Sequence, residues 1–197
     1  PERFAAEELA SHLRQMSGAE FPVRVSEGAL PDRAIVLGFG REAEALGVKA
    51  DEKLGTDGYV IRTVGDRLVI AGGRPRGTLY GVRWWTPTES FVPDQKTVVV
   101  PDTDLRQIPR LEYRDLMFNE LWSPAGKLWM ARNRVNGMTW ESLGEKTGQP
   151  GPDKLGDRYR FVGNLVHSYL RLLQKSGMPI TEDMMSLVNG KRTSGES

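Results

Sequence analysis

The chain has 197 residues, with 27 Lys and Arg against 26 Asp and Glu. The resulting net charge of +1 argues against nucleic acid or an acidic membrane surface as a partner. With 39% hydrophobic and 27% charged residues, the composition is that of a globular protein. The absence of Cys excludes thiol nucleophiles, disulfides and Cys-ligated zinc, and it leaves the compartment open.

No apolar run approaches the roughly 18 residues of a membrane-spanning helix, and no signal peptide is evident. The chain starts without Met, inside an amphipathic pattern. We therefore expect it to begin within a longer or processed product.

The first hundred residues mix helical and strand patterns. Apolar residues recur at helical spacing from Ala5 to Met16, and Gly18 follows at a C-terminal cap position, which predicts a helix. Two β-rich runs around Gly65-Asp66 predict a hairpin over 59–71. Further strands are predicted at 21–25, 34–38 and 98–100, and further helices at 42–46 and from residue 75 onward.

These elements predict an α+β domain over residues 1–107, with a mixed or antiparallel sheet that carries the first helix and the helix near Pro75 on one face. The Pro-rich stretch 101–109 is typical of a linker.

Beyond this stretch the pattern changes to strand, helix, strand. Residues 111–118 are β-like, and Ser123-Pro124 is a good helix start for a helix with Leu128, Ala131 and Val135 on its inner face. A second strand is predicted at 138–140. The pattern is that of a βαβ unit, and a partly helical segment is predicted at 161–173.

Two Gly-containing segments could bind phosphate. Gly38-Phe39-Gly40 follows a strand but lacks the third Gly and the acidic residue of a dinucleotide site, so nucleotide binding is disfavoured. The segment 72–78 could cradle a phosphate on its amides. It lacks the Lys-Ser/Thr ending of a P-loop, so a sharp structural turn is favoured.

Glycosidase chemistry needs two carboxylates at a fixed separation, or one acid and a neighbouring group on the substrate. The adjacent pairs Asp51-Glu52 and Glu182-Asp183 are candidates. Neither follows an apolar strand that would place it in a pocket, and solvated loops are favoured for both. The catalytic residues therefore remain unknown, and we expect no metal site and no cofactor.

The chain has two His and five Trp. His12 falls on the polar side of the first helix and receives no role. His167 lies among apolar residues, where a core His is favoured over a catalytic base.

The Trp side chains could stack on sugar rings or pack in the core. Core packing is favoured for Trp84, Trp85 and Trp129. For Trp122 and Trp140 the two alternatives stay level.

Four motifs carry a resemblance: ERFAAEEL (2–9), DGYVI (57–61), GTLYGV (77–82) and RWWTP (83–87). Together they resemble the non-catalytic α/β domain that precedes the barrel in family 20 β-hexosaminidases and in α-glucuronidases. Three further motifs, RLEYRD (110–115), RNRVNG (132–137) and SLVNGKR (186–192), resemble the start of the barrel in a bacterial family formerly of unknown function. Some members of that family are endo-acting β-N-acetylglucosaminidases on N-glycans.

The resemblance implies an accessory domain over 1–107 and the first βα units of a (β/α)₈ TIM barrel over 108–197. The barrel would be incomplete, because about 89 residues follow the linker where roughly 250 are needed. It further implies a glycoside hydrolase acting on N-acetylhexosamine-containing glycans, with its catalytic carboxylates outside this chain. The chain alone is then expected to be inactive. The alternative is a non-catalytic carbohydrate-binding or structural module.

The expected partners are a glycan and the rest of the same polypeptide, in a secreted or periplasmic location. Barrel sites form at the carboxyl ends of strands. The substrate-binding candidates are therefore Arg114, Asn119, Glu120 and Trp122 from the first strand and its end, Glu141 after the second strand, and His167.

By resemblance, Arg114 matches the first-strand Arg that hydrogen-bonds sugar hydroxyls in family 20 enzymes. The alternative is an ion pair with Asp115 or Glu112. The two readings stay level from the sequence.

Overall fold

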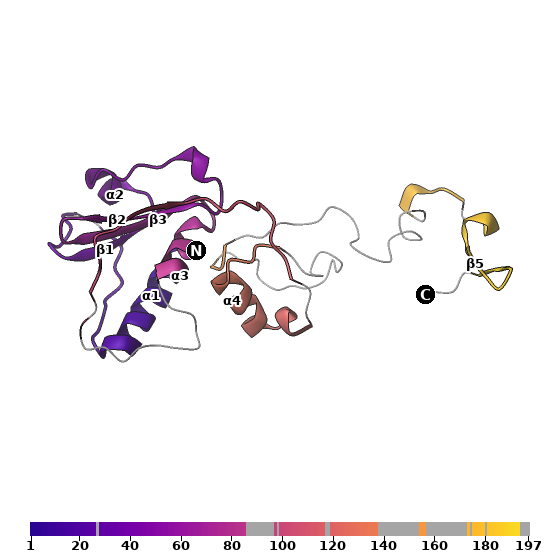
Figure 1. The fold of residues 1–197 in the computed structure, drawn as a ribbon, viewed down its shortest axis with the longest axis horizontal. Coiled ribbons are helices and arrows are strands. Elements are labelled where there is room, and N and C mark those ends of the chain that lie inside the picture. The colour runs from indigo at the N-terminus through magenta and orange to yellow at the C-terminus, as the bar shows by residue number, and fades with distance from the viewer. Residues whose placement is uncertain are drawn as a thin grey trace. The chain divides into compact units, whose positions relative to one another are not determined.

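The computed structural model describes residues 1–26, 28–85, 97, 99–116, 119–137, 154–156, 173, 175–179 and 181–193. The chain divides into two compact units, residues 1–139 with 148–159 and residues 140–147 with 160–197. The first unit holds a four-stranded sheet and the longer helices, and the second holds a short hairpin (Figure 1).

The sheet of the first unit is mixed. Its strands lie in the order β1 (Ala34–Leu37), β3 (Arg67–Gly72), β2 (Tyr59–Val64) and β4 (Asp104–Gln107). β1 runs parallel to β3, and β2 runs antiparallel to both β3 and β4. The predicted α/β class, the hairpin over 59–71 and the strand near 34–38 are confirmed.

Helices cover both faces of this sheet. Figure 1 shows α1 (Glu2–Ser17) and α3 (Gly77–Trp85) on one face and the short α2 (Arg41–Ala45) on the other. Because side chains alternate along a strand, Leu68 and Ile70 of β3 pack toward α1 and α3, while Val69 and Ala71 pack with Ala43 of α2. The predicted placement of both longer helices on one face is confirmed.

The helix α1 ends as its sequence predicts. Gly18 has φ 73°, the left-handed conformation that glycine adopts without strain, and its amide donates to the Arg14 carbonyl oxygen at 2.8 Å. One prediction for α1 is wrong. His12 is only 8% exposed and lies with Leu9 and Leu13 on the buried face, although it is polar.

Two strand predictions in the N-terminal region are wrong. Residues 21–25 alternate like a strand but form none, and Val25 is 84% exposed. Of the strand predicted at 98–100, residues 99–100 are outside any strand, and residue 98 lies outside the described part. An alternating pattern is local, whereas a strand needs a hydrogen-bonded neighbour, and the structure describes none for either segment.

Part of the predicted linker is a strand. β4 lies within 101–109 and pairs with β2, with Leu105 opposite Ile61. Only Leu105 of this strand packs against the core, and its other side chains are exposed. A polar edge strand of this kind lacks the apolar pattern by which strands are recognised.

The following segment contains the 3-10 helix η2 (Asn119–Trp122) and the helix α4 (Pro124–Arg132). The predicted start of α4 is confirmed, because the Ser123 hydroxyl accepts a hydrogen bond from the Gly126 amide at 3.0 Å. The predicted strand at 111–118 is wrong for residues 111–116, which form no strand, and residues 117–118 lie outside the described part. No neighbouring strand lies beside 111–116 among the described residues.

The second unit is described mainly at its C-terminal end. The 3-10 helix η4 (Glu182–Met184) precedes an antiparallel hairpin of β5 (Ser186–Val188) and β6 (Lys191–Thr193). The predicted strand at 138–140 lies outside the described residues, and so does nearly all of the predicted helical segment at 161–173.

Candidate functional site

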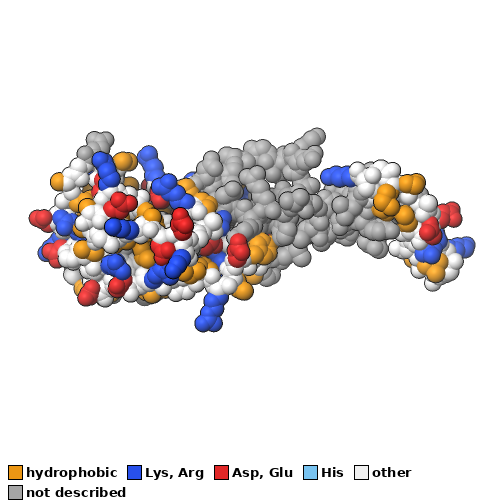
Figure 2. All heavy atoms as spheres, turned by 90° about the horizontal axis from the view of Figure 1, so that it is seen from above, with side chains coloured by type: hydrophobic (Ala, Val, Ile, Leu, Met, Phe, Trp, Pro, Cys, Tyr) orange, Lys and Arg blue, Asp and Glu red, His pale blue; other side chains and the backbone are white. Residues whose placement is uncertain are grey.

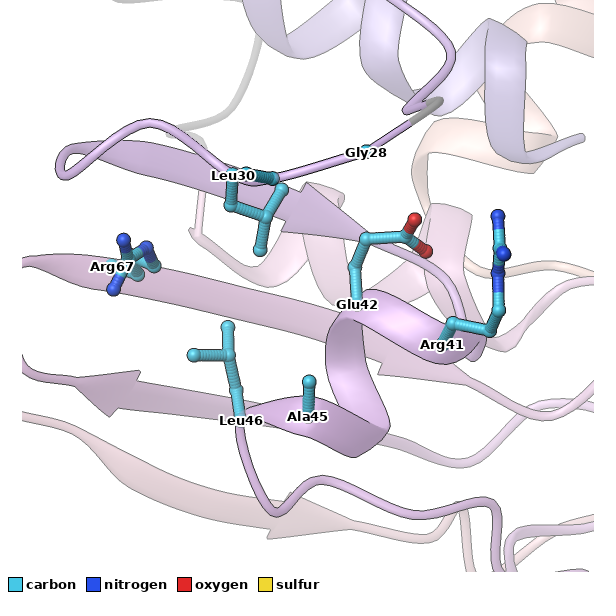
Figure 3. Close-up of a pocket in the computed structure, with 8 residues that line it drawn as sticks. Gly28, Leu30, Arg41, Glu42, Ala45, Leu46 and Arg67 are labelled. Atoms are coloured by element: carbon cyan, nitrogen blue, oxygen red, sulfur yellow. The ribbon is translucent and has the colours of Figure 1, made fainter.

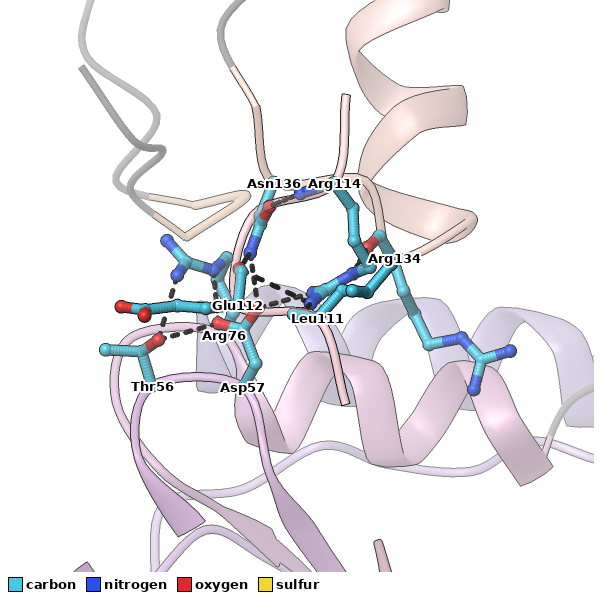
Figure 4. Close-up of polar contacts among 8 residues, drawn as sticks. All are labelled: Thr56, Asp57, Arg76, Leu111, Glu112, Arg114, Arg134 and Asn136. Atoms are coloured by element: carbon cyan, nitrogen blue, oxygen red, sulfur yellow. Dashed lines mark hydrogen bonds and ion pairs between the residues drawn. The ribbon is translucent and has the colours of Figure 1, made fainter. Parts of the chain in front are cut away.

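The most buried polar cluster of the described residues centres on Asp57. This residue ends the turn between the 3-10 helix η1 (Glu52–Leu54) and β2, and it is 6% exposed. Its Oδ1 accepts hydrogen bonds from Arg76 Nε at 2.6 Å and from the Thr56 hydroxyl at 2.9 Å. Its Oδ2 accepts from Arg114 Nη2 and from Asn136 Nδ2, the latter at 2.7 Å (Figure 4). Both oxygens of one carboxylate are thus used by donors from three separate segments.

Arg76 lies in the loop that enters α3 and is held on the turn at Thr56. Its Nη2 donates to the Thr56 hydroxyl at 2.9 Å. The amides of Arg76 and Gly77 both donate to the Thr56 carbonyl oxygen. Arg76 is therefore fixed by backbone and side chain together, and its guanidinium forms a buried ion pair with Asp57.

Arg114 is engaged through all three of its guanidinium nitrogens. Nη2 pairs with Asp57, Nε donates to the Arg134 carbonyl oxygen at 2.7 Å, and Nη1 donates to the Leu111 carbonyl oxygen. The guanidinium carbon also lies 5.7 Å from the centre of the Tyr80 ring. The carboxylate that pairs with Arg114 is that of Asp57, and not that of Asp115, which accepts a hydrogen bond from the Tyr113 hydroxyl.

Asn136 closes the cluster from the far end of α4. It is completely buried, and its Oδ1 accepts from the Arg114 amide at 2.8 Å. Its Nδ2 donates to Asp57 and to the Glu112 carbonyl oxygen. Each donor and acceptor of this side chain has a role, which accounts for a fully buried amide.

Donors converge on the Asp57 carboxylate from two guanidinium groups and one side-chain amide, in addition to the Thr56 hydroxyl. Tyr80 lies beside it: burial and the Asp57 charge raise the pKa of the Tyr80 hydroxyl to about 12. A carboxylate so fully occupied cannot act as a nucleophile or proton donor. The chemistry of this cluster is to hold segments together.

A second ionic contact joins α4 to α1. The Arg132 guanidinium donates to both carboxylate oxygens of Glu8, at 2.7 and 3.0 Å. His12 lies one turn further along α1. Burial, followed by the nearby charge of Arg83, lowers the pKa of the His12 imidazole.

The structure places the predicted site residues unevenly. Arg114 belongs to the Asp57 cluster, and Glu120 is exposed in η2. The backbone of Asn119 and Trp122 belongs to η2, while their side chains lie outside the described part. The remaining two candidates, Glu141 and His167, also lie outside the described residues. The sugar-binding role of these residues therefore stays a prediction.

Two Trp assignments are corrected. Trp84 is 47% exposed and Trp129 is 40% exposed, so neither is the core residue that was expected. Trp84 lies on α3 and Trp129 on α4, and each keeps part of its ring in water. The side chain of Trp85 lies outside the described part.

The adjacent acidic pairs are solvated, as the sequence favours. Asp51 caps η1 and pairs with Arg106 of β4 at the surface, and Glu52 is exposed. Hydrogen bonds from Arg106 and from the Lys53 amide lower the pKa of Asp51. Glu182 and Asp183 are exposed in η4. A general acid needs a raised pKa, whereas the pKa of Asp51 is lowered.

The Gly-rich segment 72–78 is a packed turn. The Gly73 amide donates to the Gly58 carbonyl oxygen, and the Gly77 amide donates within the same turn to Gly73. A Cβ on Gly73 would lie 1.7 Å from the Gly55 carbonyl oxygen. Because these amides point to backbone oxygens, they are not available to cradle a phosphate.

A shallow pocket of about 480 Å³ lies beside α2 (Figure 3). Its apolar floor is formed by Leu30, Ala45 and Leu46. The one carboxylate in it, Glu42, has its pKa lowered by its own backbone amide and by the Ser26 hydroxyl. The lining of this pocket therefore has no carboxylic acid with a raised pKa, which hydrolytic chemistry requires.

Three further observations concern the surface, the helices and the metal-ligating residue types of the described part. Acidic and basic side chains are interspersed over the face of the first unit that Figure 2 shows. None of the helices in the described part is long and apolar enough to cross a membrane. The described residues contain no group of three or more His, Asp or Glu placed to hold a metal ion.

The key residues Asp57, Arg76 and Asn136 were not predicted as a group. In the sequence, Asp57 belongs to the motif DGYVI, Arg76 to the Gly-containing segment 72–78, and Asn136 to the motif RNRVNG. The one signal for them in the sequence is the acidic residue Asp57, two positions before the strand that begins at Tyr59. Nothing in the sequence pairs it with residues 19, 57 and 79 positions away.

The N-terminal part of the chain matches a known family. Residues 1–84 match the family described as glycosyl hydrolase family 67 N-terminus. No curated protein and no solved structure matches the chain. The match supports a glycoside hydrolase relationship, without pointing to family 20 hexosaminidases in particular. The N-terminal part of this chain is therefore a glycoside hydrolase-related domain.

Proposed function

We propose that the chain is the accessory domain and the beginning of the catalytic domain of a bacterial glycoside hydrolase that acts on N-acetylhexosamine-containing glycans. The observation that carries the proposal is the match of residues 1–84 to the glycosyl hydrolase family 67 N-terminus. In this proposal the catalytic carboxylates belong to further polypeptide. Asp57, the most buried carboxylate among the described residues, is occupied by two Arg and an Asn.

The substrate class rests on the motifs outside the matched region. Residues 110–115, 132–137 and 186–192 resemble the start of a barrel in a family with β-N-acetylglucosaminidases. Two exposed aromatic side chains from this part, Tyr113 and Trp129, could stack on the apolar face of a sugar ring. A glycan partner and a secreted or periplasmic location follow from the same proposal.

A specific observation favours a second candidate function. Arg114 has all three guanidinium nitrogens bonded to protein groups, which suits a structural residue better than a sugar contact. The alternative is a non-catalytic module in which Arg114 is structural, and which packs against a neighbouring domain or binds carbohydrate through other residues.

The test compares this chain with a longer product of the same gene. Both are assayed with an aryl β-N-acetylglucosaminide and with N-glycans. We expect turnover by the longer protein and none by the 197 residues alone, because an incomplete barrel has no site for a carboxylate pair. Glycan binding by both proteins, with turnover by neither, would favour the non-catalytic module.

One result would contradict the proposal directly. If the pure 197-residue chain hydrolysed the aryl glycoside, and if changing one of its own carboxylates abolished that activity, the catalytic residues would lie within it. Absence of turnover and of glycan binding in both proteins would contradict the carbohydrate assignment.

A further inference from the structure

The segment from residue 111 to residue 137 has little to stabilise it by itself. Among the side chains that the structure describes, its own apolar cluster consists of Leu121, Met130 and Val135. Its two ends meet through the amides of Asn136 and Gly137, which donate to the Arg114 carbonyl oxygen at 3.0 and 2.8 Å. These three described side chains bury little apolar surface compared with the conformational entropy of ordering more than twenty residues.

The contacts that this segment makes with the N-terminal domain are more extensive. Asp57 binds Arg114 near the start of the segment and Asn136 near its end. Between these points, Ala131 packs into the core of α1, α3 and the sheet, and Arg132 pairs with Glu8. Figure 4 shows Asn136 and Arg114 pointing together toward Asp57 from their two chain positions.

We infer that the Asp57 carboxylate anchors residues 111–137 to the glycoside hydrolase-related domain. We further infer that this segment folds only on that domain. The surface that the domain offers to the segment is the turn at Thr56 and Asp57, to which Arg76 is hydrogen-bonded. Its partner is this segment of the same chain. The inference does not depend on whether the protein cleaves a glycan, since it concerns the order of the segment alone.

The segment depends on Asp57 because one carboxylate accepts hydrogen bonds from side chains near both of its ends, Arg114 and Asn136. In the variant Asp57→Asn the side chain keeps its shape, but it loses the charge that both guanidinium groups require. It also presents an NH₂ group to the Arg or Asn donors around it. Breaking a buried, hydrogen-bonded pair leaves uncompensated charge in the interior, which is strongly unfavourable. The segment can relieve this by moving away, whereas Arg76 is fixed by Thr56.

Hydrogen exchange on the full 197-residue chain tests the inference, with mass spectrometry resolving peptides. In Asp57→Asn we expect exchange within residues 111–137 to rise at least 10-fold, while the β2–β3 hairpin keeps its protection. The matched control is Asp51→Asn, which removes an exposed carboxylate paired with Arg106 and should change neither region.

A second variant covers the case in which Asp57→Asn fails to fold. Asn136→Asp places a second carboxylate against Asp57 and substitutes no residue of the N-terminal domain. Residues 111–137 should therefore lose protection from exchange while the hairpin stays protected. Unchanged exchange at 111–137 in a folded Asp57→Asn protein would overturn the inference. Equal loss of protection in both regions for Asn136→Asp would overturn it too, because the segment would then be part of the domain's own core.

Discussion

Asp57 and Arg114 are 57 positions apart in the sequence and form an ion pair beside the ring of Tyr80. One comes from the turn before β2 and the other from a segment without regular secondary structure. The pair gives Arg114 an internal carboxylate partner, which is the arrangement expected of a structural residue. The partner is Asp57, a residue of the N-terminal domain, and it was not among the candidates considered from the sequence.

We predict that Arg114→Ala lowers the free energy of unfolding by about 3–5 kcal/mol, the usual effect of removing one member of a largely buried ion pair. Arg114 is 21% exposed at its side chain, and Asp57 is almost fully buried. Urea denaturation measures the change. The control is Arg106→Ala, which breaks an exposed pair with Asp51 and should have an effect of about 0–1 kcal/mol.

The competing role for Arg114 has a different signature. If Arg114 contacts sugar, Arg114→Ala in a longer, active protein lowers activity and sugar affinity while the melting temperature stays nearly constant. That combination would contradict a structural role.

Tyr80 provides the second prediction. Its hydroxyl is buried and makes no hydrogen bond of good geometry with the described residues, although the Arg114 guanidinium lies near enough to act on its pKa. A buried polar group without a partner costs about 1–3 kcal/mol, so Tyr80→Phe should raise the free energy of unfolding by about 1 kcal/mol. The matched control is Tyr59→Phe, because the Tyr59 hydroxyl accepts a hydrogen bond from Arg134. Thermal and urea unfolding of both variants would measure this, and a clear loss of stability in Tyr80→Phe would refute it.

The N-terminal fold could be predicted because its signals are local. The helix ending at Gly18 and the hairpin over 59–71 each have their apolar period and their turn residues within about fifteen positions. The segment 21–25 has a similar alternation and forms no strand. Alternation shows which side chains could share a face, whereas strand formation also requires a neighbour from elsewhere in the chain.

The candidate site could not be predicted because its residues meet through long-range contacts. Arg114 was singled out by resemblance, and its location in a buried polar cluster agrees with the principle that a buried Arg must be paired.

His12 is a residue whose burial the sequence did not predict. Helical periodicity put it on the polar side, but it is only 8% exposed, with Arg83 of α3 and Arg132 of α4 close to its imidazole. Packing by a distant helix leaves no trace in a local pattern.

The third prediction concerns the turn at Gly73. A Cβ at this position would lie 1.7 Å from the Gly55 carbonyl oxygen, a backbone atom that cannot rotate away. We expect Gly73→Ala to lower the free energy of unfolding by about 3 kcal/mol, at the upper end of the usual range for overpacking. Gly28→Ala is the control, since a Cβ there would have nothing within 4 Å. Equal stability of the two variants would show that the turn is less tightly packed than the structure describes.

The last prediction is a pH dependence of stability that comes from His12. The imidazole is buried, and its Nε2 has no hydrogen-bond partner among the described residues. Burial, and then the positive charge of Arg83, lowers its pKa below the ordinary 6.5, and the charge of Arg132 acts in the same direction. Glu8 opposes these effects but does not reverse them.

The sign of the dependence follows from proton binding. At a pH between the lowered pKa of the folded state and the value of 6.5 in the unfolded state, the unfolded chain carries the additional proton. Stability therefore falls as the pH drops below about 6.5, and the loss ends once the pH is below the folded pKa. Urea unfolding between pH 7.5 and 5, compared with the variant His12→Leu, isolates this contribution from that of His167. We expect a shallower decline for His12→Leu, because a leucine in the same buried position has no proton to gain. Parallel curves for the two proteins would show that His12 titrates alike in the folded and unfolded chain, and would remove it as a source of acid sensitivity.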